Sequence, residues 1–193
     1  MLSGRRLDLL DPSPLDVEIE DIAHGLARVA RWNGQTTGEH AFSVAQHCIV
    51  VEDLVRRVKP QIEPRWRLAA LLHDAPEYVI GDMISPFKAA LGVDYRAFEE
   101  RLERAIHVRF GLPPKTPAEI ERLIKTADRV SAYFEAVDLA GFSTEEALIL
   151  FGRPPKVAKP KLDPLPPSEA QARFLDRFAG LVRLIEPASV TRP

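Results

Sequence analysis

The chain has 193 residues, enough for one well-packed domain, and its 46% hydrophobic and 28% charged residues are typical of a globular protein. A formal net charge of −2 argues against a protein that coats a polynucleotide, because such proteins carry a basic face. The only cysteine, Cys48, excludes a disulfide framework and a cysteine-based zinc site. The sequence has no run of about 18 apolar residues and no apolar N-terminal signal core. We therefore expect a cytoplasmic protein without a membrane partner.

Apolar residues at helical spacing predict that the chain is built from six to seven helices, separated by loops rich in glycine and proline. The expected helices span residues 19–30, 39–58, 65–80, 95–110, 116–139, 144–150 and 168–186, the sixth being short. No internal repeat or sustained strand pattern accompanies them. The prediction is an all-α fold, a single compact helical bundle.

Two further segments are predicted to lack helices. Residues 1–17 carry two prolines and are expected to form an N-terminal arm, and residues 152–167 carry six prolines and are expected to form an extended connector. The basic stretch within this connector could instead lie near an anion. With a core of about 18–140 and a C-terminal helix over 168–186, we expect one domain over 1–193.

Local signals refine the helix boundaries. A kink or restart is expected at Ala75–Pro76, because proline removes a backbone donor and collides with the preceding helical turn. Thr116 and Glu119 form a capping-box pattern with Pro117 at the first helical position. A long helix is therefore expected to begin at this point.

The adjacent residues His73 and Asp74 end an apolar helical run. Burying ionisable groups is costly unless they are paired or bound to a metal, so this pair predicts a site for a divalent cation. His47, on the inward face of its helix, and Asp128, within an apolar stretch, can complete the site. Two imidazoles and two carboxylates suit manganese, cobalt, iron, zinc or magnesium.

Each of these residues also has a plainer interpretation. His47 alone could be a core histidine bonded to a backbone carbonyl. Asp128 alone could form a buried ion pair with Arg129 or another cation. The pair His73-Asp74 has few explanations other than a metal. It is improbable that all four residues occur in this arrangement by coincidence.

The ordered set of these residues resembles the HD-domain superfamily of metal-dependent phosphohydrolases, which is named for its His-Asp pair. The resemblance covers about residues 18–140 and is closer still to the branch that contains 5′-deoxynucleotidases. The matching elements are Arg31-Trp32, Ser43-Val44-Ala45-Gln46-His47, His73-Asp74-Ala75-Pro76-Glu77, Gly81-Asp82, Pro86-Phe87-Lys88, and Ala127-Asp128 leading to Ala132-Tyr133. The resemblance implies an HD-type helical fold and one divalent metal ion.

Two histidines compete for the first ligand position. His40 and His47 lie seven residues apart on one predicted stripe, so either could reach a metal. We favour His47, because its surroundings match the family's first-ligand position and because it lies deeper in the stripe. Three roles are then possible for His40: it could contact a metal ligand without binding the metal, face the substrate, or pair with Glu39.

The resemblance assigns Glu77 a part in catalysis, in which it holds or deprotonates the attacking water or protonates the leaving alkoxide. A salt bridge to an arginine is the alternative for this residue. Arg31 could grip phosphate with its planar fork, and Trp32 could offer an apolar face to sugar or base, unless it only packs in the core. Asp82 could accept a hydrogen bond from a ribose hydroxyl, and Lys88 could add positive charge.

Three functions compete. The favoured one is a metal-dependent phosphomonoesterase acting on nucleoside 5′-monophosphates. The second is an HD hydrolase of another phosphorylated metabolite, such as a cyclic nucleotide, a nucleoside triphosphate or guanosine tetraphosphate. The third, a non-catalytic nucleotide or metal sensor, is disfavoured by the intact ligand set. The expected partner is a small phosphorylated molecule, and because homodimers recur among relatives, a homodimer is also expected.

Overall fold

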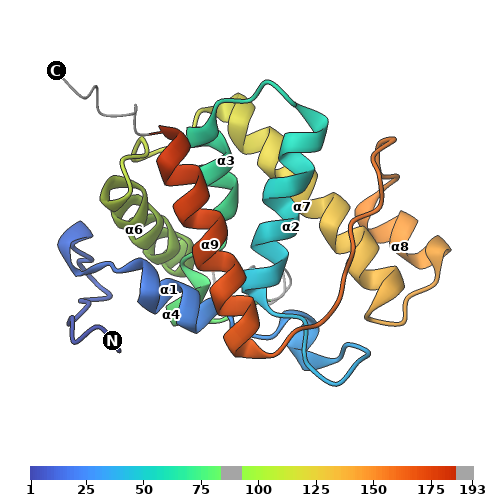
Figure 1. The fold of residues 1–193 in the computed structure, drawn as a ribbon, viewed down its shortest axis with the longest axis horizontal. Coiled ribbons are helices and arrows are strands. Elements are labelled where there is room, and N and C mark those ends of the chain that lie inside the picture. Colours follow the sequence, from blue (N-terminus) through green and yellow to red (C-terminus); the bar gives the residue numbers. More distant parts are fainter. Residues whose placement is uncertain (84–92, 186–193) are drawn as a thin grey trace, which may run out of the picture.

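The computed structural model describes residues 1–83 and 93–185, in which amphipathic segments of the sequence form helices that pack together (Figure 1). Within these ranges it contains eight α-helices and no β-strand, which confirms the predicted all-α fold. The helices are α1 (Ile19–Leu26), α2 (Val44–Val58), α3 (Pro64–Leu71), α4 (Glu77–Ile80), α6 (Val93–Arg109), α7 (Ala118–Asp138), α8 (Thr144–Phe151) and α9 (Pro167–Ile185). Short 3-10 turns at Pro14–Asp16 and Arg31–Gly34 precede α1 and α2.

Helix α2 lies at the centre of the arrangement. It packs against α7 on one side and against α3 and α9 on the other, while α8 packs on α7, and α1 lies against α4 and α9 (Figure 1). Apolar side chains of α1, α2, α3, α6, α7 and α9 meet in one continuous core. Its largest fully buried members include Leu26, Leu54, Leu71, Ile106 and Phe174.

Helix α2 begins at Val44, five residues later than predicted. Ser43 caps the helix, because its hydroxyl accepts a hydrogen bond from the backbone N–H of Gln46. The preceding loop is held in place by backbone hydrogen bonds, one of which joins Arg31 N to Phe42 O at 2.8 Å. His40 lies in this loop and is partly exposed, so its predicted place in the first helical turn was wrong.

The predicted restart at Pro76 is present. Helix α3 ends at Leu71 and α4 begins at Glu77, directly after the proline. The chain between them is a series of turns, in which Ala75 N donates to Leu72 O and Glu77 N donates to Asp74 O. This break divides one predicted helix into two and accounts for an eighth helix. It also places the predicted metal-binding pair on a turn.

The predicted capping box at Thr116 does not form. Pro117 has extended backbone angles and caps α7 without a side-chain hydrogen bond, so the helix starts one residue later and the box is out of register. A capping box occurs instead at the start of α8. There the Ser143 hydroxyl accepts from Glu146 N, and the Glu146 carboxylate accepts from Ser143 N at 2.8 Å.

The proline-rich segment runs from α8 to α9 without regular structure (Figure 1). It lies against α2, where the Gln46 amide donates to the carbonyl of Asp163 at 2.7 Å. Two of its basic side chains have carboxylate partners, since Lys159 pairs with Asp138 on α7 and Lys161 pairs with Asp163. Through these contacts the connector packs against the helical bundle.

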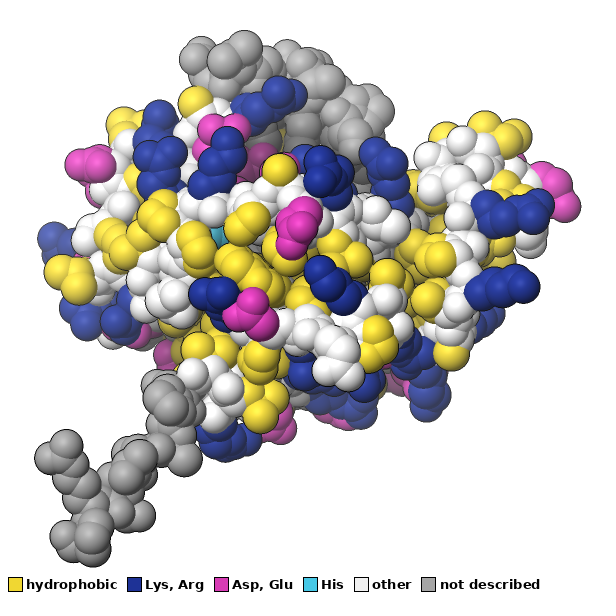
Figure 2. All heavy atoms as spheres, turned by 90° about the horizontal axis from the view of Figure 1, so that it is seen from above, with side chains coloured by type: hydrophobic (Ala, Val, Ile, Leu, Met, Phe, Trp, Pro, Cys, Tyr) yellow, Lys and Arg dark blue, Asp and Glu magenta, His cyan; other side chains and the backbone are white. Residues whose placement is uncertain are grey.

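The surface carries both signs of charge. On the face that Figure 2 shows, basic, acidic and apolar side chains are interspersed, in keeping with a net charge of −2. None of the helices in ranges 1–83 and 93–185 is both long and apolar enough to span a membrane.

Candidate metal centre

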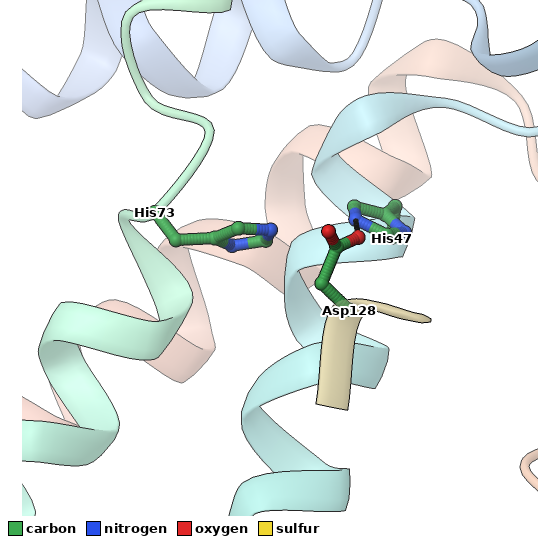
Figure 3. Close-up of side chains that lie close together, drawn as sticks. All are labelled: His47, His73 and Asp128. Carbon is green, nitrogen blue, oxygen red and sulfur yellow. Dashed lines mark ion pairs between the residues drawn. The ribbon is translucent and has the colours of Figure 1, made fainter. Parts of the chain in front are cut away.

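Three segments that are distant in sequence bring two imidazoles and two carboxylates together. His47 comes from α2, His73 and Asp74 from the turn after α3, and Asp128 from α7. Figure 3 shows His47, His73 and Asp128 of this set. His47 Nε2 lies 3.2 Å from Asp128 Oδ1 and 3.5 Å from Asp74 Oδ2, and His73 Nε2 lies 3.3 Å from the same Asp74 oxygen. Ligand atoms of His47, His73 and Asp128 all lie within 4.8 Å of one another. This cluster could hold a metal ion.

The donor atoms of both histidines fit a cation. His47 Nδ1 lies 2.6 Å from the Glu135 carboxylate and His73 Nδ1 lies 2.9 Å from the carbonyl of Ala70, so each Nδ1 carries the proton and donates it. In the neutral form of each ring, Nε2 then presents a lone pair. Both Nε2 atoms are buried without a hydrogen-bond partner among the described residues, although carboxylate oxygens face them. Lone pairs and carboxylates directed at one point repel each other unless a proton or a metal cation lies between them.

The electrostatics of the cluster also favour a cation. Burial and Arg31 lower the pKa of His47, but Glu135, Asp128 and Asp74 outweigh them and raise it well above its usual value. Burial raises the pKa of Asp74, yet His73 and His47 bring it well below its usual range, and the pKa of Asp128 is lowered in the same way. The carboxylates are thus held ionised, and a metal would take over the role of protons on the imidazoles.

Glu135 is a functional candidate that the sequence analysis missed. This fully buried carboxylate of α7 accepts hydrogen bonds from His47 Nδ1, Ser131 Oγ, Arg31 Nε and Trp32 Nε1. The ion pairs with Arg31 and His47 outweigh its burial and lower its pKa well below the usual range. A signal was available in the sequence, because residues seven apart lie on one helix face and Asp128 is seven residues earlier.

Arg31 lies between two carboxylates. Its Nε is 3.2 Å from Glu135 Oε2, and its Nη1 is 3.1 Å from Asp82 Oδ2. Burial alone would lower the pKa of Arg31, but Glu135 and Asp82, together with the more distant Asp74 and Asp128, raise it, so the guanidinium stays charged. Asp82, which we expected to accept from a ribose hydroxyl, is thus a partner of Arg31.

Trp32 has an unusual backbone conformation. Its φ is 56°, and that of Asn33 is 51°, in the left-handed region that bulky residues rarely adopt. The indole ring packs against Phe142 at 5.6 Å and Phe151 at 6.0 Å between ring centroids, while its N–H reaches Glu135 at 2.9 Å. The side chain is only partly buried, so it combines aromatic packing with an accessible surface.

The remaining predicted site residues are placed as follows. Glu77 is buried at the first position of α4, three residues after Asp74, and the break before it means that it does not share a continuous helix face with His73. Lys88 lies outside the described residues. His40 is not part of the described metal cluster.

A cavity of about 530 Å³ opens onto His73, Asp74 and Asp128 from the side of α6 and α7. A volume of this order can accommodate a small ligand. Arg31 and Trp32 are not among its described lining residues, and they reach the site through Glu135. The cavity wall carries charges of both signs, from Arg96, Glu99, Glu100, Glu103, Arg104, Lys115, Glu121 and Lys125.

The family model described as 5′-deoxynucleotidase YfbR-like matches residues 22–179. The chain belongs to this family. This confirms the predicted branch of the HD superfamily, and it makes the chain a member of a family of hydrolases that use divalent metals.

Two relatives cover nearly the same length. An uncharacterized protein of Rhodobacter capsulatus is 60% identical over 185 residues, which are 95% of this chain and 94% of that protein. The uncharacterized protein YfdR of Escherichia coli is 33% identical over 171 residues, which are 88% of this chain and 86% of that protein. The substrate therefore has to be argued from the family and the site.

Proposed function

We propose that this protein is a metal-dependent phosphomonoesterase that releases phosphate from nucleoside 5′-monophosphates. The observation that carries the proposal is the pair of buried Nε2 lone pairs, on His47 and His73, which converge with the carboxylates of Asp74 and Asp128. Family membership supplies the reaction class, and its 5′-deoxynucleotidase description supports a nucleotide substrate.

These four residues would hold one divalent ion, with manganese, cobalt, iron, zinc and magnesium as candidates for a mixed nitrogen and oxygen donor set. When bound, such an ion lowers the pKa of a water molecule and offsets negative charge on the phosphoryl group. The partly exposed carboxylates of Asp74 and Asp128 face the cavity, so substrate can approach from that side.

Arg31 and Glu77 would act on the phosphate group held at the metal, and neither belongs to the described wall of the cavity. Within the described residues the hydrogen bonds of Arg31 use Nε and Nη1, which leaves Nη2 for a phosphate oxygen. Asp82 holds this guanidinium in place, and Trp32 offers its ring to the sugar or base. Glu77, a buried carboxylate beside the ligand turn, would carry the proton that leaves the attacking water or reaches the leaving oxygen.

The test is phosphate release from a panel of nucleotides by chelator-treated protein, supplied with one metal at a time. Asp74→Asn and Asp128→Asn should each lower the rate by roughly 10³-fold, because the metal contributes several kcal/mol to the transition state. Asp138→Asn is the matched control, since Asp138 lies on the same helix as Asp128 and pairs with exposed Lys159. It should change the rate less than twofold.

Three outcomes would overturn the proposal. Phosphate release that survives both substitutions would exclude the metal site. Release of pyrophosphate, or the opening of a cyclic nucleotide without release from monophosphates, would indicate a different HD hydrolase. Tight nucleotide binding without turnover under every metal would indicate a sensor.

A further inference from the structure

One buried carboxylate joins the two halves of the candidate site. Glu135 Oε1 lies 2.6 Å from His47 Nδ1 and 2.7 Å from Ser131 Oγ, while Oε2 lies 2.9 Å from Trp32 Nε1 and 3.2 Å from Arg31 Nε. One oxygen therefore faces a proposed metal ligand, and the other faces the proposed substrate-binding residues. The side chain has no exposed surface, so water cannot replace any of these partners.

The chemistry of this position requires a carboxylate. The partners His47, Trp32 and Arg31 each present an N–H group, and Ser131 presents a hydroxyl that also donates. Only a side chain with two accepting oxygens can satisfy both groups of donors. A glutamine has the same shape, but its amide NH₂ would face donors on one side.

We propose that Glu135 is a positioning residue. Its one carboxylate orients a metal ligand on one side and the substrate-binding residues on the other, so metal binding and substrate recognition both depend on it. On the metal side, its Oε1 fixes the His47 tautomer that directs Nε2 into the cluster. On the substrate side, its Oε2 fixes the orientation of Arg31 and Trp32. The substrate half of this inference rests on the proposed function, whereas the metal half does not.

The alternative is a purely structural role, in which Glu135 only ties α7 to α2 and to the loop before it. Such a role predicts that substitutions lower the stability of the fold and leave the properties of the folded site unchanged. Metal affinity and KM therefore distinguish a positioning role from a purely structural role. A loss of stability alone changes neither constant as long as the protein stays folded.

The experiment compares Glu135→Gln, Glu135→Asp and Asp138→Asn in the full chain. The metal dissociation constant is measured by titrating chelator-treated protein with Mn²⁺, and KM is measured with a nucleoside 5′-monophosphate. Glu135→Asp, whose shorter side chain cannot reach both sides, should weaken metal binding about 10–100-fold and raise KM about tenfold. Glu135→Gln should impair at least one of the two by about tenfold, because its amide satisfies one side only.

Asp138→Asn is the matched control, since it makes the same carboxylate-to-amide change on the same helix, at a residue that pairs with the exposed Lys159 and not with the site. It should change both constants less than about threefold. Folded Glu135→Gln and Glu135→Asp proteins whose metal affinity and KM stay within threefold of wild type would overturn the inference.

A second measurement needs no substitution of Glu135. The chain has two tryptophans, so Trp66→Phe leaves Trp32 as the single indole. If Glu135 links the two halves, titration with Zn²⁺ should shift the emission of Trp32 as His47 binds the ion. An unchanged emission up to saturating Zn²⁺ would overturn the link. This signal needs no turnover, so it separates a failure of the inference from a failure of the proposed nucleotidase reaction.

Discussion

Gly25 of α1 lies directly against Tyr78 of α4. A Cβ atom on residue 25 would lie 2.8 Å from both the Cβ and the carbonyl oxygen of Tyr78, closer than side chains approach in folded proteins. Helix α4 can therefore pack this closely on α1 only because residue 25 has no side chain. Because α4 begins with Glu77, this contact sets the position of the proposed catalytic carboxylate.

Gly25→Ala should disturb both stability and turnover. The added methyl group meets backbone atoms, so α4 has to move, and overpacking of this kind costs about 1–3 kcal/mol. We expect a lower melting temperature and a kcat reduced at least fivefold, measured by thermal unfolding and by phosphate release. Gly180→Ala in α9 is the control, because nothing lies within 4 Å of its Cβ and alanine favours a helix by about 0.5–1 kcal/mol. Equal behaviour of the two variants would contradict the role given to the Gly25 contact.

Glu77→Gln should separate catalysis from metal binding. The amide keeps the shape of the side chain but cannot carry a proton, so kcat should fall by roughly 10²–10⁴-fold. Metal affinity should stay within about threefold, since Glu77 is outside the described cluster. Glu119→Gln, at an exposed position of α7, serves as the control and should behave as wild type. A parallel loss of metal affinity would instead make Glu77 part of the metal site.

Glu52 provides a stability test outside the metal site. This fully buried residue of α2 accepts from Arg67 of α3 at 2.6 Å and from Arg177 of α9. Glu52→Gln leaves both arginines uncompensated and should lower the free energy of unfolding by about 3 kcal/mol, the low end for a buried pair, because both arginines reach solvent.

The control for this test is Glu169→Gln, which removes an exposed pair with Arg173 and should cost less than about 0.5 kcal/mol. Denaturant unfolding measures both effects. Metal affinity of folded Glu52→Gln should match wild type, and a tenfold loss would show that the two regions are coupled.

Metal ions should stabilise the folded chain. Their ligands come from α2, α7 and the turn after α3, which meet only after folding, so an ion binds the native state and not the unfolded chain. At a free metal concentration of 100 times the dissociation constant, the gain is about 2.7 kcal/mol. Thermal unfolding with and without metal measures this gain. Asp128→Asn should abolish most of it, and an equal shift in this variant would place the binding elsewhere.

The sequence singled out residues that the structure brings together in the candidate cluster. His73 and Asp74 after an apolar run, and Asp128 among apolar neighbours, were identified because burial of such groups needs a reason. The restart after Pro76 was predicted because proline cannot continue a helix without losing a hydrogen bond. Both signals are local, so no knowledge of the packing was required.

The parts that were missed depend on how the helices pack. Glu135 reads as an ordinary charged residue of a long helix, and its burial follows only from the contact of α7 with α2. The start of α2 at Val44 depends on a loop that pairs with residues before and after it, including Thr37 N with Leu139 O. The helical spacing of apolar residues continues through that loop in the sequence, so it predicted a longer helix that included His40.

At Trp32, backbone strain opposes the favourable contacts of the side chain. A non-glycine residue in the left-handed region costs about 1–2 kcal/mol, which the indole hydrogen bond to Glu135 and the packing on Phe142 and Phe151 offset. A glycine would adopt this conformation without strain but would make none of those contacts. The strained backbone and the indole contacts therefore occur together, and a glycine here would relieve the strain only by releasing Glu135 and both phenylalanine rings.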